Sequence, residues 1–214
     1  MEKLIKISKK YSVNITLVFA NKYCEGLSIA QKNKILTICI EKNSYLSKIS
    51  YEMEIIKLLM KHEINLVFLA GFMYVFSEYM IKTYKGNLIN IHPSLLPSYK
   101  GLNTHTRVIL DNQKYHGATV HLINKNIDDG PIIAQAITNV ENFDTPKSLE
   151  KKILKIEHQL YPSILISIIS GNLLINSYKI FWKNKSCLPN VGESGIIRII
   201  AESNSKLNYS GGDK

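Results

Sequence analysis

The amino-acid sequence predicts an α/β protein built on a doubly wound, mostly parallel sheet. Short apolar runs alternate with segments of helical spacing over the first two thirds of the chain. The run at residues 65–70 is almost entirely apolar, as is typical of a parallel strand that helices cover on both faces. Polar residues directly follow two other apolar runs, at residues 90–92 and 128–131, where open α/β sheets place their ligand sites.

Helical and strand patterns alternate through the first half of the chain. Apolar residues recur at helical spacing in three segments, residues 2–11, 25–33 and 51–62. Apolar and β-branched residues predict four strands, at residues 14–20, 35–40, 65–70 and 88–91. Residues 71–76 form a turn, after which Ser77 is expected to cap a helix that runs to about Thr83.

The second half begins with a helix over residues 104–110, with Thr104 as its expected N-cap. Two strands follow, at residues 117–123 and 132–140. Thr145 is expected to cap a long helix that Pro146 opens and Gly171 ends. Residues 174–182 and 195–200 are expected to pair as a terminal hairpin. The 214 residues therefore predict a single domain over residues 1–201 and a polar tail over residues 202–214.

The formal charge of +10 comes almost entirely from scattered lysines, because Arg107 and Arg198 are the only arginines. Base recognition and bidentate phosphate capture favour arginine, so we expect no nucleic-acid partner. We expect no membrane partner either, since no apolar run is long enough to cross a bilayer and the first residues lack a signal peptide's apolar core. Three widely spaced cysteines indicate a reducing, cytoplasmic compartment and no metal site.

Asn90 and His92 are the first candidates for chemistry. They lie two residues apart, so on a strand they point to the same face, and Pro93 ends that strand. The pair supplies an amide donor and a group that can be an acid, a base or a cation near neutral pH. A lone histidine at a strand end is often only a structural residue, but the second polar segment around Asp128 favours an active site. These patterns alone predict an α/β enzyme with an Asn/His/Asp site.

The chain resembles the phosphoribosylglycinamide formyltransferases, the folate-dependent glycinamide ribonucleotide transformylases of purine synthesis. The resemblance covers residues 14–189 in one register and rests on five stretches, Leu69-Ala70-Gly71-Phe72-Met73, Asn90-Ile91-His92-Pro93-Ser94-Leu95-Leu96-Pro97 with Gly101-Leu102-Asn103-Thr104-His105, His116-Gly117-Ala118-Thr119-Val120-His121, Asp128-Asp129-Gly130-Pro131 and Glu157-His158-Gln159-Leu160-Tyr161-Pro162. It implies that the amine of glycinamide ribonucleotide attacks the formyl carbon of 10-formyltetrahydrofolate, without a metal.

The resemblance implies roles for the candidate residues. Asn90 and a protonated His92 would donate hydrogen bonds to the oxyanion, and Asp128 would keep His92 charged or pass the amine's proton to a water. The remaining roles fall into two groups: the folate would be bound by Met73, Tyr74, Val75, Phe76, Asn90 and Lys48, and the nucleotide substrate by Glu157, Pro93 and His121. The simpler alternatives are core packing for Phe72 and Met73, a solvated helix face for Glu157 and a hydrogen-bonded sheet histidine for His121.

The family's first strand and its glycine-rich phosphate loop have no counterpart here. The first glycine is Gly26, and the first helical pattern starts at Glu2. In a doubly wound sheet that strand is central, so two inner strands are expected to lack a shared neighbour. We expect that the functional polypeptide begins upstream of Met1; the alternative is a degenerate copy with impaired phosphate binding.

Three other functions are alternatives. A formyltetrahydrofolate hydrolase usually has a second histidine where Pro93 stands and lacks the run that ends in Thr104 and His105. A methionyl-tRNA formyltransferase has an Arg-Gly-Ala stretch in place of residues 100–102 and a separate C-terminal barrel. A non-catalytic binding homologue would bind without turnover. For the expected enzyme we predict only small-molecule substrates and a monomer or weak homodimer.

Overall fold

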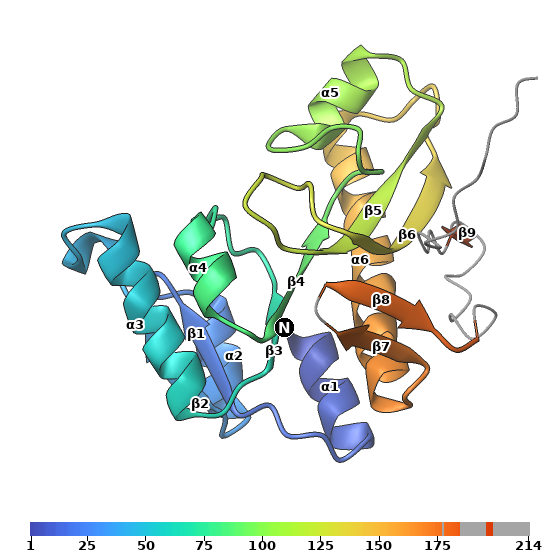
Figure 1. Cartoon of the computed structure of the whole chain (residues 1–214). Coiled ribbons are helices and arrows are strands. Elements are labelled where there is room, and N and C mark those ends of the chain that lie inside the picture. Colours follow the sequence, from blue (N-terminus) through green and yellow to red (C-terminus); the bar gives the residue numbers. More distant parts are fainter. Residues whose placement is uncertain (177, 185–195, 199–214) are drawn as a thin grey trace, which may run out of the picture.

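The computed structural model describes residues 1–176, 178–184 and 196–198 (Figure 1). Helices and strands alternate along most of this length. The helices are α1 (Glu2–Lys10), α2 (Glu25–Lys32), η1 (Lys42–Ser44, a 3-10 helix), α3 (Lys48–Lys61), α4 (Glu78–Thr83), α5 (Thr104–Leu110) and α6 (Pro146–Ile169). The strands are β1 (Leu17–Ala20), β2 (Leu36–Cys39), β3 (Leu66–Leu69), β4 (Asn87–His92), β5 (Tyr115–Leu122), β6 (Ile132–Asn139), β7 (Leu173–Asn176), β8 (Lys179–Trp182) and β9 (Ile196–Arg198).

The predicted α/β class is confirmed, and the strands form one large and two small sheets. The large sheet has the order β3-β4-β5-β6-β9, and β1-β2 and β7-β8 form separate pairs. Strands β1 and β2, and strands β3 and β4, pair in parallel, because a helix connects each pair. The β4–β5, β5–β6 and β6–β9 pairs are antiparallel, and a loop without a helix joins β5 directly to β6.

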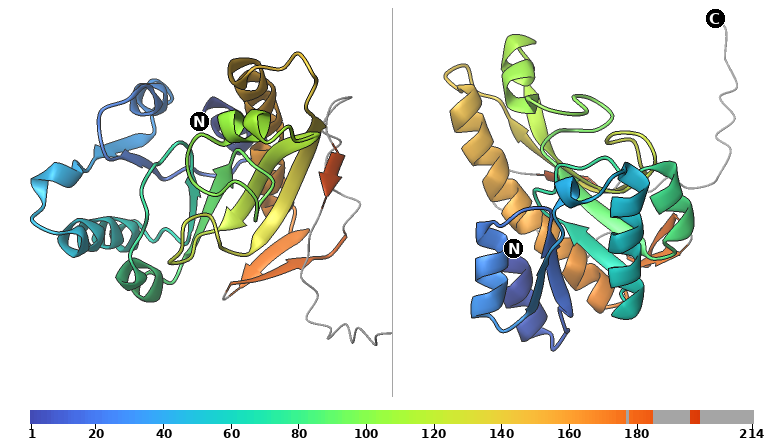
Figure 2. Two further views of the ribbon diagram at one scale, coloured as in Figure 1. Left: turned by 90° about the horizontal axis from the view of Figure 1, so that it is seen from above. Right: turned by 90° about the vertical axis from the view of Figure 1, so that its left-hand side faces the viewer.

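Helices pack on both faces of the large sheet at β3 and β4 (Figure 2). Ile89 points to one face, where it packs with residues of α1, α5 and α6. Its neighbour Leu88 points to the other face, where it packs with residues of α3 and α4. Both aliphatic side chains are almost fully buried, so β4 lies at the centre of the core. Within the described part of the chain, no helix is long and apolar enough to cross a membrane.

Several sequence-based boundaries and one strand pairing are wrong. Helix α3 begins at Lys48 rather than at Tyr51, because Ser47 and Ser50 form a capping box. The N-cap of α5 is Asn103, in a left-handed conformation, rather than Thr104. Strand β7 pairs with β8, and β9 joins β6 in the large sheet, so the expected terminal hairpin between residues 174–182 and 195–200 does not form. The tail expected from Glu202 lies outside the described residues.

Strand β1 and strand β3 belong to different sheets. Strand β1 pairs with β2, and β3 pairs with β4, so among the described residues neither strand has a second neighbour. This division falls where the sequence predicts two inner strands without a shared neighbour. Side chains still connect the two parts, since the rings of Phe19 and Phe72 lie 5.5 Å apart in an edge arrangement.

Candidate active site

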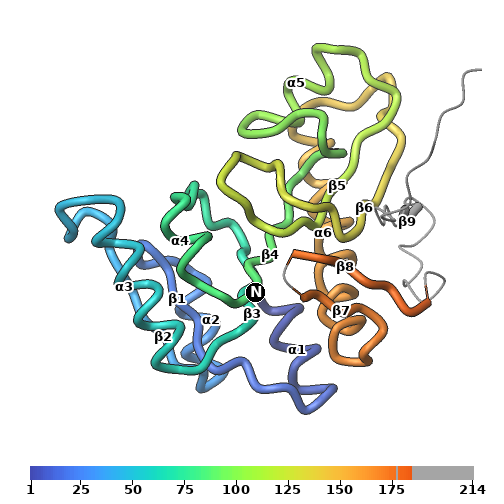
Figure 3. Tube along the Cα trace, viewed as in Figure 1, coloured from blue at the N-terminus to red at the C-terminus, as the bar shows by residue number. Residues whose placement is uncertain are grey.

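The candidate residues meet at the carboxyl end of β4. Asn90 lies opposite Leu69 of β3 on one side and opposite His121 of β5 on the other. His92 is the last residue of β4 and is opposite Thr119. The two loops that follow β4 and β5, residues 93–103 and 123–131, meet above this end of the sheet (Figure 3). The alternation of side chains along β4 therefore brings Asn90 and His92 to one site, as the sequence predicts.

His92 is held at both ring nitrogens. Its Nε2 lies 2.9 Å from the carbonyl oxygen of Tyr99, and its Nδ1 lies 3.2 Å from Oδ2 of Asp128. A carbonyl only accepts, so the neutral imidazole carries its hydrogen on Nε2. Burial lowers the pKa of His92, although the Tyr99 carbonyl and the charge of Asp128 act in the opposite direction. The resting imidazole is therefore neutral near pH 7, unlike the protonated His92 that the resemblance implies. A proton taken up at Nδ1 would face Asp128.

Asp128 links this histidine to a second one. Its Oδ2 accepts a hydrogen bond from the Gly101 N–H at 2.9 Å, and its Oδ1 lies 3.6 Å from Nε2 of His121. Burial acts to raise the pKa of Asp128, but the facing rings of His121 and His92 and the hydrogen bond from the Gly101 N–H outweigh it and lower the pKa. The backbone of Asp128 is left-handed, with φ of 47°, which aspartate tolerates better than most residues. Asp128 is therefore an ionised carboxylate between two imidazoles.

Gly130 lets the acidic loop approach β5 this closely. A Cβ atom at Gly130 would lie 1.7 Å from the carbonyl oxygen of Leu122, which no side chain could tolerate. Asn124 and Asn126 hold the loop from inside, each donating to Asp129. Asp129 also pairs with Lys100 on the facing loop. The two loops are thus tied together directly over the site.

Asn90 and His121 form a cross-strand pair. The distance between Asn90 Nδ2 and His121 Nε2 is 3.3 Å. The Nδ1 atom of His121 lies 2.9 Å from the carbonyl oxygen of Leu122, so the neutral ring carries its hydrogen there. Its Nε2 then accepts from the Asn90 amide, which has a second N–H left to donate. His121 is buried and hydrogen-bonded, as the simpler alternative predicts, but its partners place it in the candidate site.

The turn expected to contact a folate, residues 71–76, leaves β3 beside Asn90. Its side chains alternate: Met73 is 83% exposed and Val75 is 43% exposed, whereas Phe76 is buried. The rings of Phe72, Tyr74 and Phe76 pack on one another at 5.3–6.0 Å. Core packing is therefore correct for Phe72 and wrong for Met73.

Glu52 supports this turn and is absent from the sequence-based site. Its carboxylate is fully buried and accepts hydrogen bonds from the Ser77 N–H at 2.7 Å, from the Tyr74 hydroxyl at 3.1 Å and from the Ser77 hydroxyl. The sequence does indicate a buried role for Glu52, because this charged residue falls on the apolar stripe of α3. Lys48, assigned to the folate, and Lys42 each place Nζ 5.6 Å from the centre of the Tyr74 ring.

Two predicted substrate residues are not joined to this group by any hydrogen bond in the described part of the chain. Glu157 lies on α6, is half-buried, and burial raises its pKa to about 7. One turn later, the Tyr161 hydroxyl lies 2.9 Å from the carbonyl oxygen of Leu69 and 2.8 Å from that of Ile89, next to Asn90. Pro93 follows His92 and ends its strand. A fully solvated helix face does not describe Glu157, because its side chain is half-buried.

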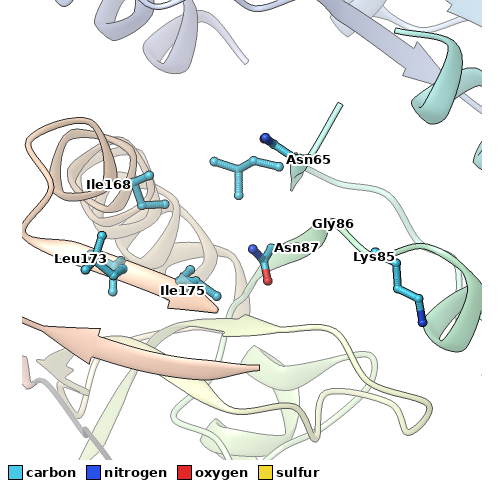
Figure 4. Close-up of a pocket in the computed structure, with 9 residues that line it drawn as sticks. Asn65, Lys85, Gly86, Asn87, Ile168, Leu173 and Ile175 are labelled. Atoms are coloured by element: carbon cyan, nitrogen blue, oxygen red, sulfur yellow. The ribbon is translucent and has the colours of Figure 1, made fainter. Parts of the chain in front are cut away.

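A surface cavity of about 330 Å³ lies at the other end of β3 and β4 (Figure 4). Asn65, Lys85 and Asn87 supply its polar atoms, and Ile168, Leu173 and Ile175 supply an apolar wall. No histidine, cysteine, aspartate or glutamate of the described chain lines it. Among the described residues, no cluster of three or more histidine, cysteine, aspartate or glutamate side chains could hold a metal. The acid–base groups therefore gather at the His92 end of the sheet.

Comparison with known proteins agrees with this placement. The model of the formyl transferase family matches residues 2–165. The phosphoribosylglycinamide formyltransferase of Bacillus subtilis (strain 168) is 36% identical over 143 residues, which cover 67% of this chain and 73% of that protein. The trifunctional purine biosynthetic protein adenosine-3 of Gallus gallus is 35% identical over 187 residues; the match covers 86% of this chain but 19% of that protein, so the chain spans about a fifth of its length.

The fold agrees as well. A solved structure of the phosphoribosylglycinamide formyltransferase of Coxiella burnetii superposes with a TM-score of 0.79 at 34% identity, covering 85% of this chain and 86% of that one. The matched family model includes every residue of the Asn90, His92, His121 and Asp128 group. The chain belongs to the formyl transferase family.

Proposed function

We propose that this protein transfers the formyl group of 10-formyltetrahydrofolate to the amine of 5′-phosphoribosylglycinamide, a step of de novo purine synthesis. The observation that carries the proposal is the convergence of Asn90, His92 and Asp128 at one strand end, in a chain of the formyl transferase family. An amide donor, a neutral imidazole and an ionised carboxylate suit attack by an amine on a formyl carbon. Such an attack creates an oxyanion and releases a proton.

Asn90 is the donor for the oxyanion. One amide hydrogen is used by His121, which leaves the other to donate to the formyl oxygen as the carbon becomes tetrahedral. A donor that is already aimed at the developing charge is typically worth ~3 kcal/mol of transition-state stabilisation. The His121 contact fixes which end of the amide faces the substrate.

His92 carries the proton. Because the resting imidazole is neutral, its Nδ1 can accept the proton that the attacking amine loses. The resulting imidazolium is stabilised by Asp128 at 3.2 Å and adds positive charge beside the oxyanion. As the tetrahedral centre collapses, the bond to the folate nitrogen breaks and His92 returns the proton to that nitrogen. The low pKa of Asp128 suits a lasting counter-charge better than a proton carrier.

The substrates occupy the two sides of this group. The folate lies against Met73 and Val75 of the exposed turn, with Tyr74 and Phe76 holding the turn's shape and Lys48 available to its anionic tail. The glycinamide ribonucleotide lies on the side of His121 and Pro93, and Glu157 binds its ribose. A carboxyl whose pKa is about 7 can donate or accept a hydrogen bond to a hydroxyl.

A folate-release assay with and without glycinamide ribonucleotide tests the proposal. Release that requires the amine is the expected result. Release without the amine would identify a formyltetrahydrofolate hydrolase, a function that Pro93 and the Thr104-His105 pair argue against. A folded protein that releases folate under neither condition would be a binding homologue, and both outcomes would contradict the proposal.

A further inference from the structure

Arg107 contacts two parts of the loop that closes the site, although the proposed chemistry does not use it. Its Cζ lies 5.2 Å from the centre of the Tyr99 ring, and its Nη1 donates to the carbonyl oxygen of Lys100 at 2.7 Å. Arg107 is exposed on α5, and it is one of only two arginines among 27 basic residues. Stacking on a ring while donating to a carbonyl needs a planar guanidinium, which lysine lacks.

The loop that Arg107 contacts has a demanding backbone. Tyr99 has φ of 58° and Gly101 has φ of 77°, so the chain turns twice through the left-handed region. For tyrosine this conformation costs of order 1 kcal/mol or more and persists only with outside support. The Tyr99 hydroxyl donates to Asp111 Oδ2 at 2.8 Å, just after α5. Arg107 and Asp111 together hold the Tyr99 ring against α5.

The same loop supplies two backbone contacts to the catalytic pair. The carbonyl of Tyr99 accepts from His92 Nε2 at 2.9 Å, and the N–H of Gly101 donates to Asp128 at 2.9 Å. These two groups flank Lys100, whose carbonyl Arg107 binds. One exposed side chain therefore holds the peptide segment that orients both His92 and Asp128.

We propose that Arg107 is a positioning residue for the His92–Asp128 pair, an inference that rests on the proposed formyl transfer. It acts through the backbone at Tyr99 and Gly101 and touches no reacting atom. Among the charges near His92, Asp128 raises its pKa, whereas His121 and Arg107 lower it. His105 and His116 also interact electrostatically with His92. Loss of the planar guanidinium and loss of its charge should therefore have different effects.

Three variants separate these effects. Arg107→Lys keeps the charge and removes the planar guanidinium, and Arg107→Met removes both. Lys114→Met is the control, because it removes an exposed charge from the segment between α5 and β5. Turnover, KM, thermal midpoint and the ¹⁵N resonances of the His92 ring are measured for each. Both Arg107 variants should unfold like the wild type, lose ~10-fold in kcat with a smaller change in KM, and show a shifted Nε2 resonance. Only Arg107→Met should move the acid limb of the pH profile upward.

The ring resonances keep the two proposals apart. Unchanged His92 resonances in both Arg107 variants overturn the inference, whatever the rates are, and so does a kcat for Arg107→Lys within twofold of the control. A wild-type protein without amine-dependent turnover overturns the proposed function alone. In that case a shifted Nε2 resonance still supports Arg107 as the residue that positions His92, and an unshifted one still overturns it.

Discussion

The side chains of Asn90 and His121 face each other across β4 and β5, with Nδ2 of one 3.3 Å from Nε2 of the other. This contact fixes the orientation of the amide that we assign to the oxyanion. Replacing His121 by Phe removes the acceptor while keeping a ring in the sheet. We expect kcat to fall by roughly 10- to 100-fold, because a donor that is free to rotate is no longer aimed.

The control for this prediction is His116→Phe, because His116 is equally buried on the same strand but contacts His105 instead. Single-turnover rates and unfolding midpoints are measured for both variants. Equal losses of rate in the two would mean that general disturbance of β5, rather than the Asn90 contact, explains the effect.

The His92–Asp128 pair is expected to be essential. Replacing either residue by Asn should lower turnover by about 10²–10⁴-fold, because proton transfer and charge stabilisation are both lost. The pair lies at the carboxyl end of β4 under two loops, so circular dichroism should show an intact fold. Stopped-flow measurement of folate release gives the rate, and a near-normal rate in either variant would exclude the proposed mechanism.

The acid limb of the pH profile should report His92. Activity requires the neutral ring, and burial places its pKa below the ordinary value of 6.5, so the acid limb of kcat/KM should be centred below pH 6.5. The same shift affects stability. Below pH 6.5 the His92 ring binds a proton more readily in the unfolded chain than in the folded protein. The contribution of His92 to the free energy of unfolding is therefore present above pH 6.5 and lost as the pH falls.

An NMR titration of the ring checks the assignment. In Asp128→Asn the counter-charge that raises the pKa is gone, so the His92 titration should move to lower pH. A movement to higher pH would contradict the electrostatic account of the pair.

Glu52 should stabilise the turn at residues 71–76, which we assign to folate binding. Glu52→Gln replaces a carboxylate that accepts three hydrogen bonds by a neutral amide with a single acceptor oxygen, so we expect a loss of about 2 kcal/mol in unfolding free energy and a higher KM for the folate. Tyr74→Phe removes only one of the three donors and should cost about 1 kcal/mol. Denaturant unfolding and initial rates measure both effects, and equal losses would argue against a shared role for the carboxylate.

Glu157 should link stability to pH in the direction opposite to His92. Its folded pKa of about 7 exceeds the ordinary value of 4.5, so the folded state holds a proton that the unfolded chain releases, and stability falls as the pH rises from about 4.5 to 7. Glu157→Gln should therefore stabilise the protein at pH 8, by ~1 kcal/mol after allowance for residual solvent access, while weakening substrate binding. Glu150→Gln, an exposed carboxylate on the same helix, is the control for thermal scans at pH 5 and pH 8.

The sequence predicted the features that depend on residues close together in the chain. The alternation along β4 placed Asn90 and His92 on one face, and Thr145 caps α6 with Pro146 in its first turn, as expected. The β7–β8 pairing and the placement of β9 were missed, because strand partners are chosen by contacts between distant segments.

The backbone contacts to His92 and Asp128 could not be predicted from the sequence either. Two of the contacts that hold His92 and Asp128 come from backbone atoms of Tyr99 and Gly101. Their positions depend on left-handed dihedral angles, which the side chains of that loop do not specify. Glu52 was different, because a charge on the buried stripe of α3 is visible in the sequence and signals a hidden partner.

The separation of β1 and β2 from the large sheet has a consequence for local unfolding. Among the described residues, no backbone hydrogen bond ties either strand to the five-stranded sheet, and contacts such as Phe19 against Phe72 carry the coupling. A segment attached only by side chains can open as its own cooperative unit, at a lower free energy than global unfolding. Proteolytic nicking around residues 14–40 would then report this local opening, while the His92–Asp128 pair stays assembled.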